Sequence, residues 1–208
     1  MPESTRLRDL PAGRVDPRHR DRLIGGLLAS IEERGYAATT IADIVRHAGV
    51  SKRTFYKHFA DKEEALRALY AFASDNLDRR IVRALGDQAD WRAQCHAGVR
   101  AFVQGLAEYP GLARTILLEM PAAGPLSLAL RTEMHDRFAV TISAAAAAAR
   151  RENPELNEIT PELSAAFIGA IYELIIRSLQ RGEIDPDGVA DTATQLISAV
   201  ATAPPPSS

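Results

Sequence analysis

Cysteine is almost absent from this sequence, and long apolar stretches are missing. Cys95 is the sole cysteine among 208 residues, so no disulfide can form within the chain, which fits a reducing compartment. The first twenty residues lack the apolar core of a signal peptide. The longest apolar stretches, near 139–149 and 165–176, are shorter than the about 20 residues of a membrane span or carry Glu173. We therefore expect a soluble, cytoplasmic protein without a membrane partner.

Motifs of catalysis and metal binding are also missing. The sequence contains no HExxH, CxxC, Walker-type glycine loop or nucleophile elbow. Cys95 and His96 are neighbours, so on a helix they point about 100° apart and do not readily share a metal ion. We expect no enzymatic activity, no metal site and no cofactor; an all-helical enzyme stays as an alternative.

Acidic residues are missing from one stretch, Ile44 to Ala60, which holds four Lys and Arg residues and two histidines. Through Lys62 the chain has 12 Lys and Arg against 8 Asp and Glu; from Glu63 onward it has 13 against 19. The two parts therefore carry +4 and −6, which add to the net charge of −2. This asymmetry favours a basic first module attached to a part with another task.

Helical spacing of apolar residues predicts an all-α fold of about nine helices without strands. Gly35 is typical of the end of the first helix. Thr40 with Asp43 is typical of a capping box at the start of the second, and Ser51 and Asp61 can cap the third and fourth. Thr160-Pro161 and Asp185-Pro186 place a proline after an N-cap, which predicts the start of the last two helices. The expected organisation is a flexible arm at 1–15, a helix-turn-helix domain at 16–62, a ligand-binding and dimerisation domain at 63–203 and a disordered tail at 204–208.

The second and third of these helices, joined by Ala48-Gly49-Val50, predict a helix-turn-helix. Gly49 can take the positive φ that a sharp turn between crossing helices needs. If Phe55 and Phe59 face the core, the polar side chains of the third helix face outward, and such a helix enters the major groove of DNA. The alternative is a solvated basic helix. The candidate DNA-contacting residues are Thr40, Lys52, Arg53, Thr54, Tyr56, Lys57, His58 and Lys62.

Residues 36–66, YAATTIADIVRHAGVSKRTFYKHFADKEEAL, resemble the N-terminal domain of TetR-family transcription regulators. Beyond Leu66 only the run of helices is similar. Val45 and Arg53 depart from the family pattern, since a small residue is frequent at both positions, and Arg53 is left to contact either a base or a phosphate. The resemblance rests on Thr39-Thr40, Ile44, Ala48-Gly49-Val50-Ser51, Thr54, Tyr56, His58-Phe59, Lys62 and Leu66.

The resemblance implies an all-helical homodimer whose N-terminal domains bind a palindromic operator in double-stranded DNA. It also implies a small-molecule effector bound in the larger C-terminal domain. We expect a repressor that the effector releases from DNA by shifting the fourth helix. A regulator that activates, or that needs no effector, stays as an alternative.

The last two helices are candidates for the dimer interface. The helix that begins near Pro161 is apolar almost all round, which indicates burial on several sides. One side would face its own domain and the other a partner subunit, as in a four-helix bundle across a two-fold axis. The alternative is burial in one monomeric core. The residues expected at the interface are Phe167, Ile168, Ile171, Ile175, Leu196, Ile197 and Val200.

A ligand pocket would lie among the middle helices, where large apolar side chains recur. For each of these residues, ordinary core packing is the alternative. Glu173 is explained equally well by an ion pair with Arg177 four residues later. The apolar character of the set favours a lipophilic or aromatic effector. The candidate lining residues are Trp91, Cys95, Phe102, Met120, Met134, Phe138 and Tyr172.

Overall fold

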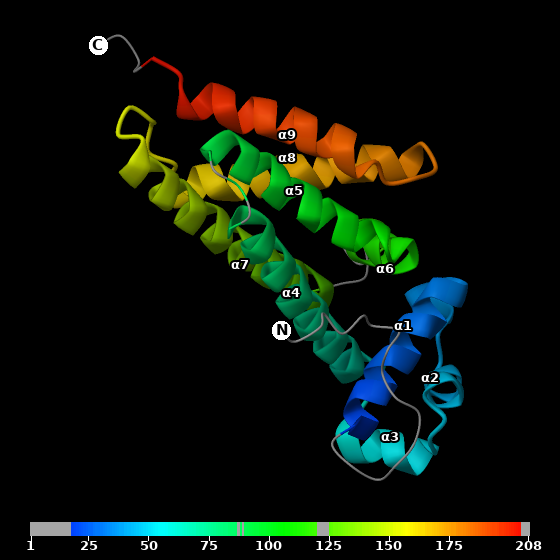
Figure 1. Ribbon diagram of the computed structural model, residues 1–208. Helices are drawn as coiled ribbons and strands as arrows, with labels where there is room; N and C mark the ends of the chain where they lie inside the picture. The colour runs from blue at the N-terminus through cyan, green and yellow to red at the C-terminus, as the bar shows by residue number, and fades with distance from the viewer. Residues whose placement is uncertain (1–17, 87, 89, 120–124, 205–208) are drawn as a thin grey trace. The chain divides into compact units, whose positions relative to one another are not determined.

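The computed structural model describes residues 18–86, 88, 90–119 and 125–204. Within these ranges the secondary structure is entirely helical, which confirms the predicted all-α class (Figure 1). The predicted arm at 1–15 lies outside the described residues. The elements are α1 (Arg18–Ala38), α2 (Ile41–Ala48), α3 (Lys52–His58), α4 (Lys62–Gly86), α5 (Trp91–Ala107), α6 (Pro110–Arg114), a π-helical turn (Thr115–Glu119), α7 (Pro125–Glu152), α8 (Pro161–Gln180) and α9 (Pro186–Ala201).

The chain divides into two compact units, an N-terminal unit that ends at Ser74 and a C-terminal unit that begins at Asp75. The helix α4 contributes residues to both units. Every helix in the described ranges is too short or too polar to cross a membrane.

The turns of the N-terminal unit follow from its capping residues. Thr40 and Asp43 form the predicted capping box at the start of α2, because each side chain accepts a hydrogen bond from the other residue's backbone N–H. Gly49 ends α2 with φ 61° and ψ 40°. At Gly35 the backbone of α1 leaves helical geometry, with φ 77°, before the chain continues to Ala38. Both glycines therefore take backbone angles that other residues rarely adopt.

The core of the N-terminal unit joins α1 to α2 and α3. Leu27 of α1, Ile44 of α2 and Phe55 of α3 are completely buried. Gly26 allows α1 to approach α2 closely, since a Cβ atom there would lie 2.5 Å from the carbonyl oxygen of Ile44 and 2.9 Å from the amide nitrogen of Ala48. Both atoms belong to the backbone, which cannot move aside as a flexible side chain can.

Gly26→Ala is therefore expected to destabilise the N-terminal unit, by about 1–3 kcal/mol as for other overpacked sites. Urea denaturation followed by circular dichroism would measure the loss. Gly169→Ala is the matched control, because a Cβ atom at this position in α8 meets no atom within 4 Å. An alanine at position 26 that left the unfolding midpoint unchanged would contradict the close contact.

In the C-terminal unit, α5 packs on α9, and α7 packs on α8 (Figure 1). Thr160 caps α8 by accepting a hydrogen bond from the backbone N–H of Leu163 at 3.3 Å. Asp185 caps α9 by accepting one from Gly188 at 3.0 Å. A proline follows each cap, so the two predicted helix starts are confirmed.

Candidate DNA-binding surface and effector cavity

The helix α3 turns a polar, cationic side to solvent. Lys52 lies four residues before Tyr56, and Arg53 four residues before Lys57, so the four side chains share one side of the helix. All four are exposed, and Tyr56 has 58% of its surface accessible. Phe55 on the opposite side is completely buried, and this anchor holds the polar side outward.

Other candidate residues of α3 interact partly within the N-terminal unit. The hydroxyl of Ser51 accepts a hydrogen bond from the amide of Thr54 at 3.1 Å, and the hydroxyls of these two residues lie 3.0 Å apart. His58 is half-buried, and its ring meets that of His19 edge-on with centroids 6.3 Å apart. Thr54 and His58 therefore stand at the margin of the exposed surface.

The positive charge of the stretch from Ile44 to Ala60 is not all available to a partner. Arg46 and His47 both contact the carboxylate of Glu33, at 3.2 and 2.9 Å. Hydrogen bonds from Arg34 first, and then from His47 and Arg46, lower the pKa of Glu33 to about 2, so this carboxylate is ionised and neutralises its neighbours.

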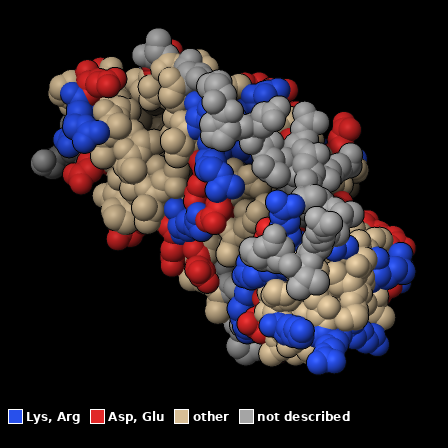
Figure 2. All heavy atoms as spheres, turned by 60° about the horizontal axis from the view of Figure 1, so that its bottom comes forward, with Lys and Arg blue, Asp and Glu red and all other residues tan. Residues whose placement is uncertain are grey.

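The other Lys and Arg residues of this stretch differ from Arg46 and His47; they are Lys52, Arg53 and Lys57. None of the three forms an ion pair with an acid in the described part of the chain. Figure 2 shows Lys and Arg side chains gathered at the end of the N-terminal unit that carries α3. Within the stretch from Ile44 to Ala60, the positive charge without an acidic partner is therefore on α3.

Thr40 and Lys62 have structural partners in addition to their predicted contacts with DNA. The hydroxyl of Thr40 lies 2.6 Å from the carboxylate of Asp43 within the capping box. The Lys62 ammonium donates hydrogen bonds to the carbonyls of Tyr36 and Thr39, at 3.0 and 2.8 Å, and lies 4.2 Å from the centroid of the Tyr36 ring. Partial burial lowers the pKa of Lys62. Lys62 thus holds the connection between α1 and α2 in place.

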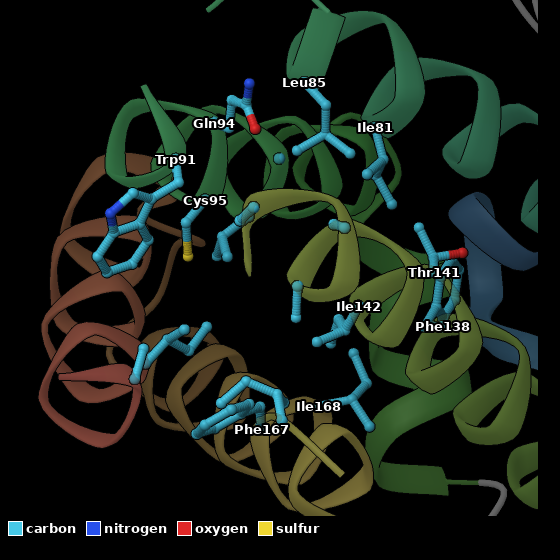
Figure 3. Close-up of a pocket in the computed structure, with 18 of the residues that line it drawn as sticks. Ile81, Leu85, Trp91, Gln94, Cys95, Phe138, Thr141, Ile142, Phe167 and Ile168 are labelled. Atoms are coloured by element: carbon cyan, nitrogen blue, oxygen red, sulfur yellow. The ribbon is translucent and has the colours of Figure 1, made fainter. Parts of the chain in front are cut away.

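An apolar cavity lies among α4, α5, α7, α8 and α9 of the C-terminal unit (Figure 3). The cavity has a volume of about 120 Å³, or about 950 Å³ when all the empty space out to its opening to solvent is included. Among the described residues, the lining contains no Asp, Glu, Lys or Arg, and its polar groups include Gln94, Thr141 and Asn157. Burial raises the pKa of the Cys95 thiol, so this lining side chain is also neutral. The cavity therefore suits an uncharged, mainly apolar group.

Four of the predicted pocket residues line this cavity: Trp91, Cys95, Phe102 and Phe138. Met134 and Tyr172 are buried but are not among its lining residues, and Tyr172 instead stacks on Phe102 with centroids 5.9 Å apart. Met120 lies outside the described residues. The remaining lining includes residues that the sequence did not single out, among them Ile81, Leu85, Ile142, Ala145, Ala146 and Ala149.

Several residues predicted at a dimer interface belong to the core of their own chain. Phe167, Ile168, Ile171 and Ile175 are each at most 4% exposed, and the first three line the cavity, as does Ile197. The four α8 side chains thus pack within their own chain, and a role for these residues at a dimer interface stays a prediction. Leu196, which is 43% exposed, and the partly exposed Val200 remain available to a partner.

The helices α1 to α4 also match a known family of sequences. Residues 23–69 fit the profile described as bacterial regulatory proteins, tetR family. This segment of the chain is therefore a TetR-type N-terminal domain. The predicted resemblance is thus confirmed, and the matched residues include the whole of α2 and α3.

Individual TetR-type relatives are similar over part of the chain. The HTH-type transcriptional activator FasR of Mycolicibacterium smegmatis is 38% identical over 87 residues, which are 40% of each protein. Nucleoid occlusion factor SlmA of Aliivibrio fischeri is 27% identical over 99 residues, 47% of this chain and 50% of that protein. The chain thus spans about half the length, or less, of these curated relatives.

The TetR-type fold extends over both units. The crystal structure of the transcriptional regulator FadR from Bacillus subtilis in complex with stearoyl-CoA has a TM-score of 0.75 to this chain. It is 17% identical in sequence, and the match covers 86% of this chain and 97% of FadR. At this level of identity the likeness shows that the fold is shared.

Proposed function

We propose that this protein is a transcription regulator that binds a palindromic operator through α3 and releases it when a small, largely apolar effector enters the C-terminal unit. The observation that carries the proposal is the exposed side of α3, where Lys52, Arg53 and Lys57 form no ion pair with any acid among the described residues. Arg and Lys side chains donate to the O6 and N7 atoms of guanine or to phosphates, and Tyr56 offers its hydroxyl to a phosphate. The N-terminus of α2 at Thr40 is a second place for a phosphate.

Selection of bound DNA from a random-sequence pool by the purified protein tests this proposal. We expect a palindromic winner whose affinity falls steeply with salt, because each phosphate contact releases counterions. If no sequence is enriched at any salt concentration, and protein freed of co-purified ligand by unfolding and refolding behaves in the same way, the proposal fails.

Dimerisation is part of the proposal, because one short recognition helix reaches few bases and two half-sites are read about 34–36 Å apart. The outward side of α8 and α9 supports a two-fold contact. It carries exposed small residues at Ala165 and Ala166 of α8, and exposed or partly exposed Leu196 and Val200 of α9. Small side chains allow two helices to approach closely, and the apolar residues beside them provide area to bury.

Leu196→Arg is expected to shift the protein from dimer to monomer, because a buried charge without a partner opposes association. Sedimentation velocity would show the change, and operator affinity should fall with it. Val140→Arg is the control, since Val140 of α7 is even more exposed at 69% and lies outside the proposed interface. A dimer that persisted in Leu196→Arg would place the interface elsewhere.

The effector part of the proposal rests on the neutral cavity, whose lining includes Ile81 and Leu85 of α4. Since α4 begins in the N-terminal unit, a ligand that moves its second half also acts on the unit that carries α3. Effector and DNA are then coupled negatively, typically by 1–3 kcal/mol, and the coupling is reciprocal. That FadR was crystallised with stearoyl-CoA supports a lipophilic effector here as well.

Repression is the direction we propose, through occupation of a promoter by the unliganded dimer. FasR is described as an activator, so likeness in the N-terminal domain does not by itself determine the direction. A reporter gene behind the selected operator decides between the two: deletion of the regulator raises expression under repression and lowers it under activation.

A further inference from the structure

A second hollow adjoins the apolar cavity at the end of α7. It measures about 350 Å³, and Ala146 and Ile159 line both spaces. Ala146 is small, and Ile159 belongs to the connection between α7 and α8, so the two hollows meet at these two side chains. The second hollow thus forms an outer vestibule to the cavity.

The vestibule has the opposite chemistry to the cavity. Arg150 and Arg151, both exposed, line it together with a single acid, Glu158. Neither arginine forms an ion pair with an acid in the described ranges. The Nε atom of Arg150 donates to the carbonyl of Leu156 at 3.1 Å, and this hydrogen bond does not use the terminal nitrogens of the guanidinium. Two arginines against one glutamate give the vestibule an excess positive charge.

Another groove on the C-terminal unit is lined by cations, but these have partners. Arg100 pairs with Asp187 at 2.5 Å. Arg80 pairs with Glu108, and its two terminal nitrogens each donate to one carboxylate oxygen of Glu108 at 2.7 Å. That groove also shares no lining residue with the apolar cavity. Of these two hollows, the vestibule is therefore the one that offers an anionic group beside the cavity arginines without an acidic partner among the described residues.

We propose that the effector is a single-chain amphiphile with an anionic headgroup, its apolar chain in the cavity and its headgroup on Arg150 and Arg151. This inference rests on the proposed effector role of the same cavity. The cavity, at about 120 Å³, is close in size to an apolar cavity of about 150 Å³ that holds benzene. It can take the end of the chain, and the empty space toward its opening can take the rest. Arginine is suited to the head, because its planar guanidinium binds carboxylate and phosphate oxygens in pairs.

The test uses the fluorescence of Trp91, which lines the cavity and is the only tryptophan of the protein. Palmitate, palmitoyl-CoA and the neutral analogue hexadecanol are titrated into the full-length protein below their critical micelle concentrations. We expect at least one of the two anionic ligands to bind about tenfold or more tightly than hexadecanol, as for a charge-assisted hydrogen bond.

Arg151→Glu is expected to abolish that advantage, and it should leave the fold intact because the exposed Arg151 side chain forms no ion pair within the described part of the chain. Arg181→Glu makes the same change of charge just beyond the C-terminal end of α8, whereas the vestibule lies before its N-terminal end, and it should leave binding unchanged. Glu158→Ala should tighten binding of the anionic ligands. Arg150→Lys keeps the charge and should retain most of the preference.

Each outcome has a definite meaning. Preference for palmitate alone identifies a carboxylate as the recognised head, and preference for palmitoyl-CoA alone identifies phosphates; both support the proposal. Equal affinity for hexadecanol with a silent Arg151→Glu, or no response to any of the three ligands, overturns it. Because the readout is binding to the protein without DNA, such a failure is distinct from failure of the operator selection.

Discussion

Lys62→Ala is expected to destabilise the N-terminal unit by about 1.5–3 kcal/mol. A hydrogen bond of a charged group contributes about that much, and the partial exposure of the Lys62 ammonium to solvent keeps the sum of its two hydrogen bonds within this range. The variant loses both hydrogen bonds to the carbonyls of Tyr36 and Thr39. These carbonyls precede the capping box at Thr40, so α2 loses its fixed starting point. Urea denaturation without DNA measures this effect separately from any contact with phosphate.

Lys57→Ala is the matched comparison, because Lys57 is exposed in the same unit. Its loss should change stability by no more than about 0.5 kcal/mol. It should weaken binding to all operator sequences alike and reduce the salt slope by about one. If Lys62→Ala instead retains full stability and shows only this weaker, flatter binding, then Lys62 serves as a phosphate contact and not as a structural tie.

Arg137→Ala is expected to uncouple the effector from DNA, with a loss of up to the whole 5- to 150-fold effect that such coupling typically has. The guanidinium of Arg137 in α7 contacts the carboxylates of Asp75 and Asp78 in α4, each at 2.5 Å. The next residue, Phe138, lines the cavity. A displacement of α7 by a ligand is thus passed to α4 at the very residue where the C-terminal unit begins.

The measurement is operator affinity with and without an effector found by the Trp91 assay. Effector binding itself should persist in Arg137→Ala, so the Trp91 signal remains while release from DNA is lost. Arg79→Ala is the control, because Arg79 donates a hydrogen bond to Asn76 of its own helix at 3.2 Å and forms no ion pair within the described part of the chain. This variant should leave release intact. Full release by the effector in Arg137→Ala would exclude this route of coupling.

Features set by short-range signals were predictable from the sequence. The capping box at Thr40, the positive φ of Gly49 and the prolines after Thr160 and Asp185 act within a few residues, and each lies where it was expected. The inward direction of Phe55 also followed from the helical period. These signals are local, so one sequence contains all the information that they need.

Features set by contacts distant in the chain were not predictable in the same way. A count of charges between Ile44 and Ala60 could not show that Arg46 and His47 pair with Glu33, since Glu33 lies on the preceding helix. The apolar period of α8 could not show whether Phe167 meets its own chain or another. In both cases the partner is chosen by tertiary packing, which the sequence pattern of one helix does not contain.

The cavity illustrates the same limit, and it exists because side chains are small where α7 passes it. Ala145, Ala146 and Ala149 contribute little volume, and larger residues at these positions would fill the space. The room for the apolar part of a ligand thus depends on three residues whose side chains cannot form hydrogen bonds. Replacing these alanines by larger residues on one face of α7 would therefore change which ligand the regulator binds. The operator that it is proposed to recognise through α3 would stay the same.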